Sequence, residues 1–375
     1  MNKHHNATPS TDSPRRHRSL WRTAAAVGAA ALSLSLAACV GPPASHWAKQ
    51  AQQECPWQPD SSIRTTATIA YQGIPNGDLI VKDRRILETC MPNAKVEWKR
   101  FDAGADVLQG FGSGSLDLGL LGSSLVARGA SEPLELDLVV PWAFDVIGDA
   151  EALVVKDTNA KQITDLRGKT IAASFGSTSH FSLLNALKGA GMDANRDVKL
   201  INLAPDKMLS GWQSNQIDAA WVWDPTLSQL AKDGHIITSS KATAEAGAPT
   251  YDMAAGTRQF VEGNTQFMEQ WARAQNYAAE EIAKDPKAAA ASIAVELGAS
   301  GADVEKQLRG YEYPTAAKQA SPAILGGKAG ETLTSTADFL KQNNLIDAPA
   351  GEATFRRVLA PQPAAAASAP AANQK

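Results

Sequence analysis

From Arg64 onward, short runs rich in β-forming residues alternate with stretches of helical pattern. This alternation is typical of βα units, which build mainly parallel sheets with helices packed against them. A self-contained block of the same kind begins near residue 170 and closes near residue 239. We therefore predict an α/β fold. The expected strands are residues 66–71, 95–101, 116–121, 152–155, 170–175, 198–203, 219–223 and 236–239, and the expected helices are residues 78–89, 105–111, 179–190, 205–214 and 225–232.

The composition changes after Phe260, where long stretches rich in Ala, Glu, Lys and Gln show helical periodicity. Residues 271–284, 286–297 and 332–342 are predicted to form amphipathic helices. The last 17 residues, 359–375, are rich in Ala and Pro and carry no core-forming pattern. We predict that they form a disordered tail.

The N-terminus has the pattern of an export signal. Five basic residues precede an uncharged run, residues 23–38, which is shorter than the roughly 20 residues of a spanning helix. The run ends in Leu36-Ala37-Ala38-Cys39, which resembles a bacterial lipoprotein signal, in which the Cys is acylated and becomes the mature N-terminus. We predict that residues 1–38 are removed, that Cys39 carries a lipid anchor and that residues 39–64 form a tether. An ordinary signal peptide cut near Ala38 is the alternative.

Cys55 and Cys90 are 35 residues apart, and neither belongs to a C-x-x-C motif or has a His at ligand spacing. A metal site or a redox dithiol is therefore not expected. Export delivers the chain to an oxidising compartment, which favours a structural disulfide between the two. We predict that this bond contributes roughly 3–4 kcal/mol and tethers residues 45–62 to the first domain.

Charge argues against nucleic acid as a partner. Residues 1–38 hold five Lys or Arg against one Asp, so the remaining 337 residues carry a net charge of −7. The chain has no dense run of Lys or Arg, and binding to nucleic-acid phosphates depends on such clusters. Small molecules or other proteins are the expected partners.

The motifs of common enzymes are missing. Only His180 and His235 lie within the predicted domains, and the chain has no match to G-x-S-x-G, H-E-x-x-H, the P-loop or G-x-G-x-x-G. A hydrolase needs a positioned nucleophile and base. We therefore predict no catalytic residue, metal or cofactor, and an enzyme with an unfamiliar site is the alternative.

Two strand-to-helix loops have the composition of an anion site. One loop brings Ser177, Thr178 and Ser179 to a predicted helix N-terminus, where backbone N–H groups and the helix dipole attract anions. Ser123 and Ser124 follow another strand in the same way. Two such loops on opposed sheets would hold one oxyanion from both sides. Plain N-capping is the alternative for each loop.

Aromatic and acidic residues stand at other positions where a ligand crevice is expected. Trp221 and Trp223 share one face of a strand, and a residue at the carboxyl end of a strand faces the crevice of an α/β sheet. Trp223 is a candidate to cover a cation or an alkyl stem, with core packing as the alternative. Glu151 and Asp252 lie near the two expected crossings between domains. Both are candidates to face a ligand cation, and a solvated loop carboxylate is the alternative.

Seven segments of the sequence together match a known family. They are FDAG at 101–104, GLLGSS at 119–124, EALVV at 151–155, DLRGK at 165–169, STSHFSLL at 177–184, WVWDP at 221–225 and GAPTYD at 247–252. In this order they resemble the taurine and alkanesulfonate solute-binding proteins of ABC importers. The resemblance implies a type II periplasmic binding fold, in which two α/β lobes joined by two crossover strands close over a ligand. It implies a first lobe of residues 65–154 plus 254–358 and a second lobe of residues 155–253.

The resemblance also implies roles for single residues. Trp223 would pack on the ligand's ethylene stem, Asp252 with Glu151 nearby would meet its ammonium group, and Gln72 matches a polar pocket position. Trp142 and Phe144 belong to a segment that is bulkier than the family pattern, so they are candidates to reshape the pocket. The residues that would hold the sulfonate are Ser123, Ser124, Ser177, Thr178, Ser179 and His180.

The function implied by the resemblance is that of a lipid-anchored, monomeric, extracytoplasmic binding protein. It would capture taurine or a related organosulfonate and deliver it to membrane permease subunits. One alternative is a binder of aliphatic sulfonates or sulfate esters, in which Asp252 does not contact the ligand. Another is an enzyme of thiamine-precursor synthesis on the same fold, but such enzymes depend on a Cys-rich motif that this chain lacks. A structural or adhesive lipoprotein is the third.

Overall fold

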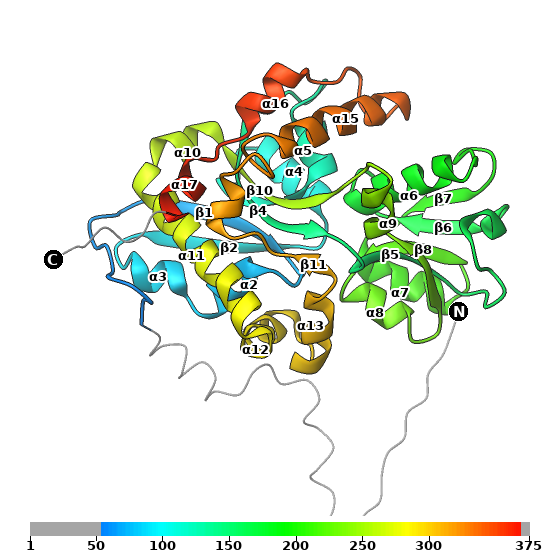
Figure 1. Cartoon of the computed structure of the whole chain (residues 1–375), viewed down its shortest axis with the longest axis horizontal. Helices are drawn as coiled ribbons and strands as arrows, with labels where there is room; N and C mark the ends of the chain where they lie inside the picture. The colour runs from blue at the N-terminus through cyan, green and yellow to red at the C-terminus, as the bar shows by residue number, and fades with distance from the viewer. Residues whose placement is uncertain (1–53, 369–375) are drawn as a thin grey trace, which may run out of the picture. The chain divides into compact units, whose positions relative to one another are not determined.

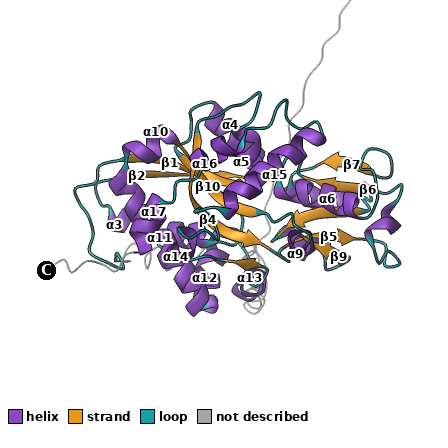
Figure 2. Ribbon diagram, turned by 45° about the horizontal axis from the view of Figure 1, so that its top comes forward, coloured by secondary structure: helices purple, strands orange, loops and turns teal. Residues whose placement is uncertain are grey.

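The computed structural model describes residues 54–368, whose strands form two separate sheets (Figures 1 and 2). The larger sheet has the strand order β11-β4-β10-β3-β1-β2, and the smaller sheet has the order β7-β6-β8-β5-β9. We call each sheet with its helices a lobe, lobe 1 for the larger and lobe 2 for the smaller. The strands are β1 (Thr66–Gln72), β2 (Lys95–Phe101), β3 (Leu118–Gly122), β4 (Leu138–Ile147), β10 (Tyr251–Thr257) and β11 (Tyr311–Glu312) in lobe 1, and β5 (Glu151–Val155), β6 (Thr170–Ala173), β7 (Lys199–Asn202), β8 (Ala219–Trp223) and β9 (His235–Ser239) in lobe 2.

Helices follow most of these strands, as the alternation in the sequence predicts. Lobe 2 holds the 3₁₀-helix η1 (Ile163–Leu166) and the helices α6 (Thr178–Gly189), α7 (Pro205–Gln213), α8 (Thr226–Leu230) and α9 (Ser240–Glu245). The helices of lobe 1 are α2 (Gly77–Asp83), α3 (Ile86–Cys90), α4 (Gly104–Gly112), α5 (Ser123–Gly129), α10 (Arg258–Gly263), α11 (Thr265–Lys284), α12 (Pro286–Leu297), α13 (Gly301–Leu308), α14 (Ala316–Gln319), α15 (Lys328–Gln342), α16 (Glu352–Val358) and α17 (Gln362–Ser368).

The prediction of mainly parallel sheets is wrong for the strands near the crossings between lobes. β1 pairs in parallel with β2 and β3, and β6 pairs in parallel with β7 and β8. In contrast, β10 pairs antiparallel with β3 and β4, β11 with β4, and β5 with β8 and β9. A helix crossover inside a βα unit imposes parallel pairing. β4, β5 and β10 enter or leave a lobe without such a unit, so they are free to pair antiparallel.

The chain passes between the lobes from β4 to β5 and again from α9 to β10. The expected boundaries after residues 154 and 253 therefore fall inside β5 and β10. Both strands are almost wholly buried, and such an uninterrupted run of buried residues does not reveal where the chain changes sheets. At the first crossing, the Gly148 N–H donates to the Gly310 carbonyl at 3.0 Å. A Cβ on Gly310 would lie 2.5 Å from the Ala150 nitrogen, so only glycine permits this approach.

Two bulky residues expected near the ligand lie in the hydrophobic core of lobe 1 instead. Trp142 and Phe144 are 1% and 4% exposed, and the Phe144 ring meets the edge of Trp271 on α11 at 6.2 Å between centroids. Neither lines the pocket described below. The expectation that they reshape the pocket is not met, because the large helix α11 provides them with an apolar partner.

The single helix expected at residues 78–89 is two helices, α2 and α3, separated at Arg85, whose φ of 51° is left-handed. The predicted disordered tail is wrong for its first part, since residues 362–368 form α17 with Pro363 and Ala364 buried. α17 packs against α11. Alanine has the highest helix propensity, and its small side chain allows close packing without a conspicuous hydrophobic pattern.

A disulfide joins Cys55 to Cys90, which confirms the predicted pairing. Around it, the Asp60 N–H donates to the Cys90 carbonyl at 2.7 Å, and the Trp57 indole donates to Gln270 at 2.8 Å. The segment from residue 54 onward is thus held on α3 and α11. The predicted signal, the lipidation site Cys39 and the rest of the tether lie outside the described residues.

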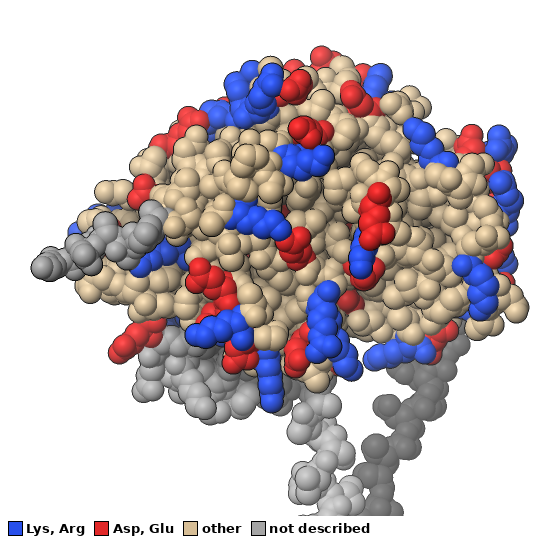
Figure 3. All heavy atoms as spheres, viewed as in Figure 1, with Lys and Arg blue, Asp and Glu red and all other residues tan. Residues whose placement is uncertain are grey.

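Within residues 54–368, no helix is both long and apolar enough to cross a membrane. Acidic and basic side chains are interspersed on the face seen in Figure 3, without a large patch of one sign. This face therefore offers no electrostatic footprint for a polyanion.

Candidate functional site

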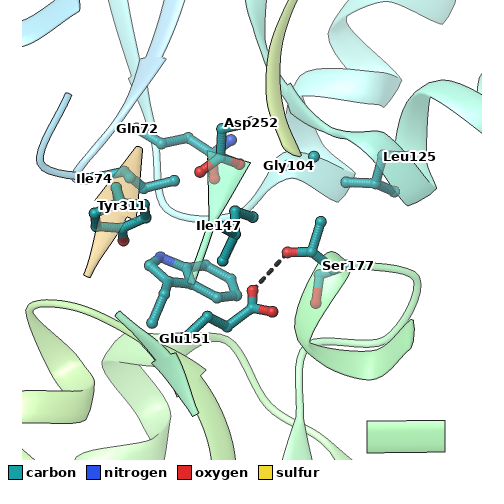
Figure 4. Close-up of a pocket in the computed structure, with 12 residues that line it drawn as sticks. Gln72, Ile74, Gly104, Leu125, Ile147, Glu151, Ser177, Asp252 and Tyr311 are labelled. Carbon is teal, nitrogen blue, oxygen red and sulfur yellow. Dashed lines mark hydrogen bonds between the residues drawn. The ribbon is translucent and has the colours of Figure 1, made fainter. Parts of the chain in front are cut away.

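A pocket between the two lobes collects side chains from both sheets (Figure 4). Asp252 and Gln72 lie on the lobe 1 side in this view, and Glu151 and Ser177 lie opposite them. The lobe 1 lining consists of Gln72, Ile74, Gly104, Gly122, Leu125, Ile147, Asp252 and Tyr311, and the lobe 2 lining consists of Glu151, Ser177, Thr178 and Trp223. Of the predicted ligand-binding residues, the structure brings Gln72, Glu151, Ser177, Thr178, Trp223 and Asp252 to this pocket.

Three helix N-termini meet at the pocket. Gly104 is the first residue of α4, Gly122 immediately precedes α5, and Ser177 caps α6 by accepting the His180 N–H at 3.4 Å. The first N–H groups of a helix have no partner inside the helix, and they carry its partial positive charge. A Cβ on Gly122 would lie 2.8 Å from the Thr178 methyl group, so this glycine lets the two lobes approach. The pocket therefore suits an anionic group.

Glu151, the first residue of β5, is buried and accepts hydrogen bonds from several hydroxyl groups of lobe 2. Thr178 and Ser179 donate to its Oε2 at 2.6 and 3.0 Å, and Ser240 and Ser182 donate to its Oε1 at 2.5 and 3.5 Å. Burial raises the pKa of Glu151, and these hydroxyls oppose the rise. The hydroxyls of Thr178 and Ser179, which the sequence assigned to an anionic ligand, are thus directed at a carboxylate of the protein.

Asp252 lies opposite a second acid that the sequence analysis did not single out. In the antiparallel register of β4 and β10, Asp252 is paired with Asp145, and both are buried. Burial raises the pKa of Asp252 to about 8, and the neighbouring Glu151 charge contributes. The pKa of Asp145 is raised by burial and by the charges of Asp252 and Glu151. Neither Asp145 carboxylate oxygen accepts a hydrogen bond from the described residues.

Four predicted ligand contacts do not reach the pocket wall, and each has another partner. Ser123 Oγ accepts the Tyr251 N–H at 3.2 Å, and Ser124 Oγ donates across the lobes to the Gly176 carbonyl at 2.8 Å. Ser179 donates to Glu151. The His180 Nδ1 accepts the Gly176 N–H at 3.2 Å while its ring stacks on Phe175. Burial lowers the pKa of His180 to about 4, so this ring is neutral at pH 7.

Two aromatic side chains frame the space between the acids. Trp223 is the cross-strand partner of Glu151 in the pairing of β5 with β8, so the two side chains lie beside each other on one face. Tyr311, on the short strand β11, pairs with Ile147 at the end of β4. Its buried hydroxyl has no hydrogen-bond partner among residues 54–368. Gln72 donates to the Leu120 carbonyl at 3.0 Å and fixes the end of β1.

Asp145 and Tyr311 are polar site residues that the sequence analysis missed, as it missed the apolar lining residues Ile74, Leu125 and Ile147. The sequence does not predict a strand at residues 138–147, so it cannot predict the pairing of Asp145 with Asp252. Tyr311 comes from a two-residue strand in the helical C-terminal part, which carries no strand pattern. An acidic residue within the otherwise apolar run at residues 138–147 was the one available indication.

The family model described as NMT1-like matches residues 87–295 of this sequence, which is more than half of the chain. The chain belongs to the NMT1-like family. Over 267 residues it is 34% identical to the taurine-binding periplasmic protein of Escherichia coli (strain K12), and this alignment covers 69% of the chain and 81% of the relative. The resemblance found in the sequence is therefore confirmed.

Solved structures similar to this NMT1-like protein share its fold. The alkanesulfonate-binding protein SsuA from Xanthomonas axonopodis pv. citri, bound to MOPS, has a TM-score of 0.64 at 23% identity, covering 82% of this chain and 99% of that one. The desulfurization enzyme DSZB has a TM-score of 0.59 at 15% identity, covering 81% and 99%. The predicted two-lobe type II periplasmic binding fold is confirmed. The DSZB likeness shows that an enzyme also uses this fold.

Proposed function

We propose that this protein is the substrate-binding component of an ABC importer and that it binds taurine or a closely related aminoalkanesulfonate. The observation that carries the proposal is that the pocket combines a region suited to an anion with a buried acid suited to a cation. The N-termini of α4, α5 and α6 meet on its wall together with the buried carboxylate of Asp252. A small zwitterion with separate anionic and cationic ends matches this arrangement. The identity with a taurine-binding relative supports it.

The sulfonate would bind at the helix N-termini. A sulfonate stays anionic at physiological pH, so backbone N–H groups can hold it without proton exchange. The Ser177 hydroxyl is a further donor, because its oxygen accepts from His180 and its hydrogen remains free to bind an anion. Thr178 and Ser179 would contribute their backbone N–H groups, since their hydroxyls donate to Glu151.

The ammonium group would meet Asp252, with Trp223 against the ethylene stem. An aminoalkanesulfonate neutralises the buried acid, whereas a plain alkanesulfonate leaves it without a partner, at a cost of about 1–3 kcal/mol. Taurine has seven heavy atoms, so the ceiling of about 1.5 kcal/mol per atom limits its binding free energy to roughly 10 kcal/mol. Lobe closure provides contacts on all sides of so small a ligand.

We infer a binding protein rather than an enzyme, because the relatives with substantial identity are binding proteins and the enzyme DSZB is only 15% identical. We also keep lipid attachment at Cys39, a monomeric state and delivery to permease subunits as parts of this proposal. A plain aliphatic sulfonate is the second candidate ligand, and the likeness to an alkanesulfonate-binding protein favours it over other anions.

Calorimetry with taurine, ethanesulfonate and 2-aminoethylphosphonate tests the proposal, in a buffer that is not itself a sulfonate. We expect taurine to bind about 10-fold to 100-fold more tightly than ethanesulfonate, because only taurine pairs with Asp252. Mass spectrometry of any ligand retained after native purification provides an independent check. Equal affinity for taurine and ethanesulfonate would favour the second candidate, and binding of no sulfonate would refute the proposed function.

A further inference from the structure

Asp145 and Asp252 form a buried carboxyl pair on the lobe 1 side of the pocket. They are direct partners across β4 and β10, and they are 0% and 5% exposed. Side chains of directly opposed residues point to the same face of a sheet. Asp252 lines the pocket, as does Ile147, two residues beyond Asp145 on β4 (Figure 4). The pair therefore stands at the pocket wall, with Asp145 behind Asp252.

The groups around this pair are acids and phenols. Glu151 on β5 faces it from lobe 2, and Tyr311 and Tyr313 face it from lobe 1, with Asp224 beyond the two phenols. Glu151 and Asp224 have hydroxyl partners of their own. Among residues 54–368, no Lys or Arg contributes to the shifted pKa of either member of the pair. The described part of the chain therefore supplies no Lys or Arg to neutralise these carboxyl groups.

Two adjacent carboxylates cannot both remain ionised at low cost in such surroundings. As ionised groups, both are acceptors only, so neither could donate a hydrogen bond to the other, and no Ser, Thr, Asn, Gln, Lys or Arg side chain among residues 54–368 donates to Asp145. If one carboxyl group retains its proton, it becomes an O–H donor to the other, and the negative charge of the pair falls by one. Burial and the Glu151 charge raise the pKa of both acids, and the Asp252 charge raises that of Asp145 further, in the direction that such sharing requires.

We propose that Asp145 and Asp252 share one proton at neutral pH and that a ligand ammonium group displaces it to solvent. The inference rests on the proposed function, which supplies a ligand with a cationic end. In the exchange, the O–H bond of one carboxyl group breaks and its proton passes to the buffer. The ammonium keeps its own protons and donates to the Asp252 carboxylate, behind which Asp145 adds its negative charge. Asp145 is thus a specificity residue that makes recognition of the cation dependent on pH.

The exchange predicts that the affinities of ligands with and without an ammonium group depend differently on pH. Between about pH 6 and pH 8, the affinity for taurine should rise with pH by up to 10-fold per unit, since one proton leaves for each ligand bound. The affinity for ethanesulfonate, which has no ammonium group to displace the proton, should not rise over this range.

Calorimetry at pH 7 in phosphate, imidazole and triethanolamine measures the protons released, because the observed heat varies with the ionisation enthalpy of the buffer. None of these buffers is a sulfonate. We expect the wild-type protein to release close to one proton per taurine and close to none per ethanesulfonate. Asp145→Asn should still bind taurine but release almost no proton, since an amide donor replaces the shared O–H. Asp338→Asn, a change at an exposed acid on α15, should retain the wild-type value.

Infrared spectroscopy of the wild-type protein gives a second measurement, which does not depend on the variant folding. A band from the shared carboxyl proton should be present at pH 7 without taurine and should be lost when taurine is added, while any signal from buried Asp78, whose pKa is raised to about 7, stays unchanged. Taurine binding without proton release, or a band that is absent before taurine is added, would overturn the shared proton and leave the proposed function intact. Failure of taurine to bind would overturn both.

Discussion

The two walls of the pocket each bury a carboxyl group, but they stabilise it in different ways. On the lobe 2 wall, Glu151 accepts hydrogen bonds from the hydroxyls of Thr178, Ser179, Ser182 and Ser240. On the lobe 1 wall, Asp145 accepts no hydrogen bond from a hydroxyl, amide or basic side chain of residues 54–368 and faces another acid. Burial alone therefore does not identify a ligand contact.

The difference indicates that Glu151 supports the fold of lobe 2, whereas the Asp145–Asp252 pair is available to bind a cation. The hydroxyls around Glu151 come from α6 and α9, so this carboxylate joins two helices to β5 and positions the N-terminus of α6. Asp145 and Asp252 on the lobe 1 side join no helices to a strand in this way. A buried charge without partners costs several kcal/mol, and natural proteins retain one where a ligand compensates it.

The largest effect expected is on stability when Glu151 is removed. Glu151→Ala leaves four buried hydroxyls without their acceptor and should lower the free energy of unfolding by about 3 kcal/mol or more. Urea unfolding of the ligand-free protein measures this loss. Glu331→Ala, at an exposed glutamate of α15, is the matched control and should change stability by about 1 kcal/mol or less. Similar losses for both variants would remove the structural distinction drawn for Glu151.

The lobe 1 pair predicts a pH dependence of stability in the ligand-free protein. A folded-state pKa of about 8 for Asp252, raised from 3.8, means that the folded protein holds a proton that the unfolded chain has lost. Stability from this group is complete below pH 4 and falls as the pH rises toward 8. The loss between pH 6 and pH 8 should be about 2 kcal/mol.

Thermal unfolding across this pH range, with and without taurine, measures the effect. Asp252→Asn should weaken the dependence without removing it, because burial also raises the pKa of Asp78 to about 7. His180 opposes this trend only near pH 6, because its pKa, lowered to about 4, costs stability as the pH falls through 6.5. A wild-type protein whose stability is constant from pH 6 to pH 8 would argue that the acid pair is ionised throughout.

The smallest effect concerns the hydrogen bond that links the two walls. Ser124 on α5 donates to the Gly176 carbonyl just before α6, and removing one such bond costs about 1 kcal/mol. Ser124→Ala should weaken taurine and ethanesulfonate alike by about fivefold, because the bond stabilises the closed arrangement and not one end of the ligand. Calorimetry with both ligands tests this. Selective weakening of taurine would instead connect Ser124 to the cation end.

The sequence predicted the fold and much of the site because its βα units have strong local patterns. Ser177 and Thr178 follow a strand and begin a helix, so their place at the pocket could be inferred from order alone. The hydrogen bonds from Thr178 and Ser240 to Glu151 could not be inferred, since these residues are 27 and 89 positions from Glu151. The partnership of Asp145 with Asp252 depends on the register of two antiparallel strands, which no local pattern encodes. α17 was missed because alanine packs without a hydrophobic pattern.

Paired calorimetric titrations of taurine and ethanesulfonate into wild-type protein and Asp252→Asn test the central claim most directly. If Asp252 recognises the ammonium group, the wild type prefers taurine by about 10-fold or more and the variant binds both ligands with nearly equal affinity. If Asp252→Asn keeps the full preference for taurine, the cation is recognised elsewhere and the assignment of the lobe 1 wall is wrong.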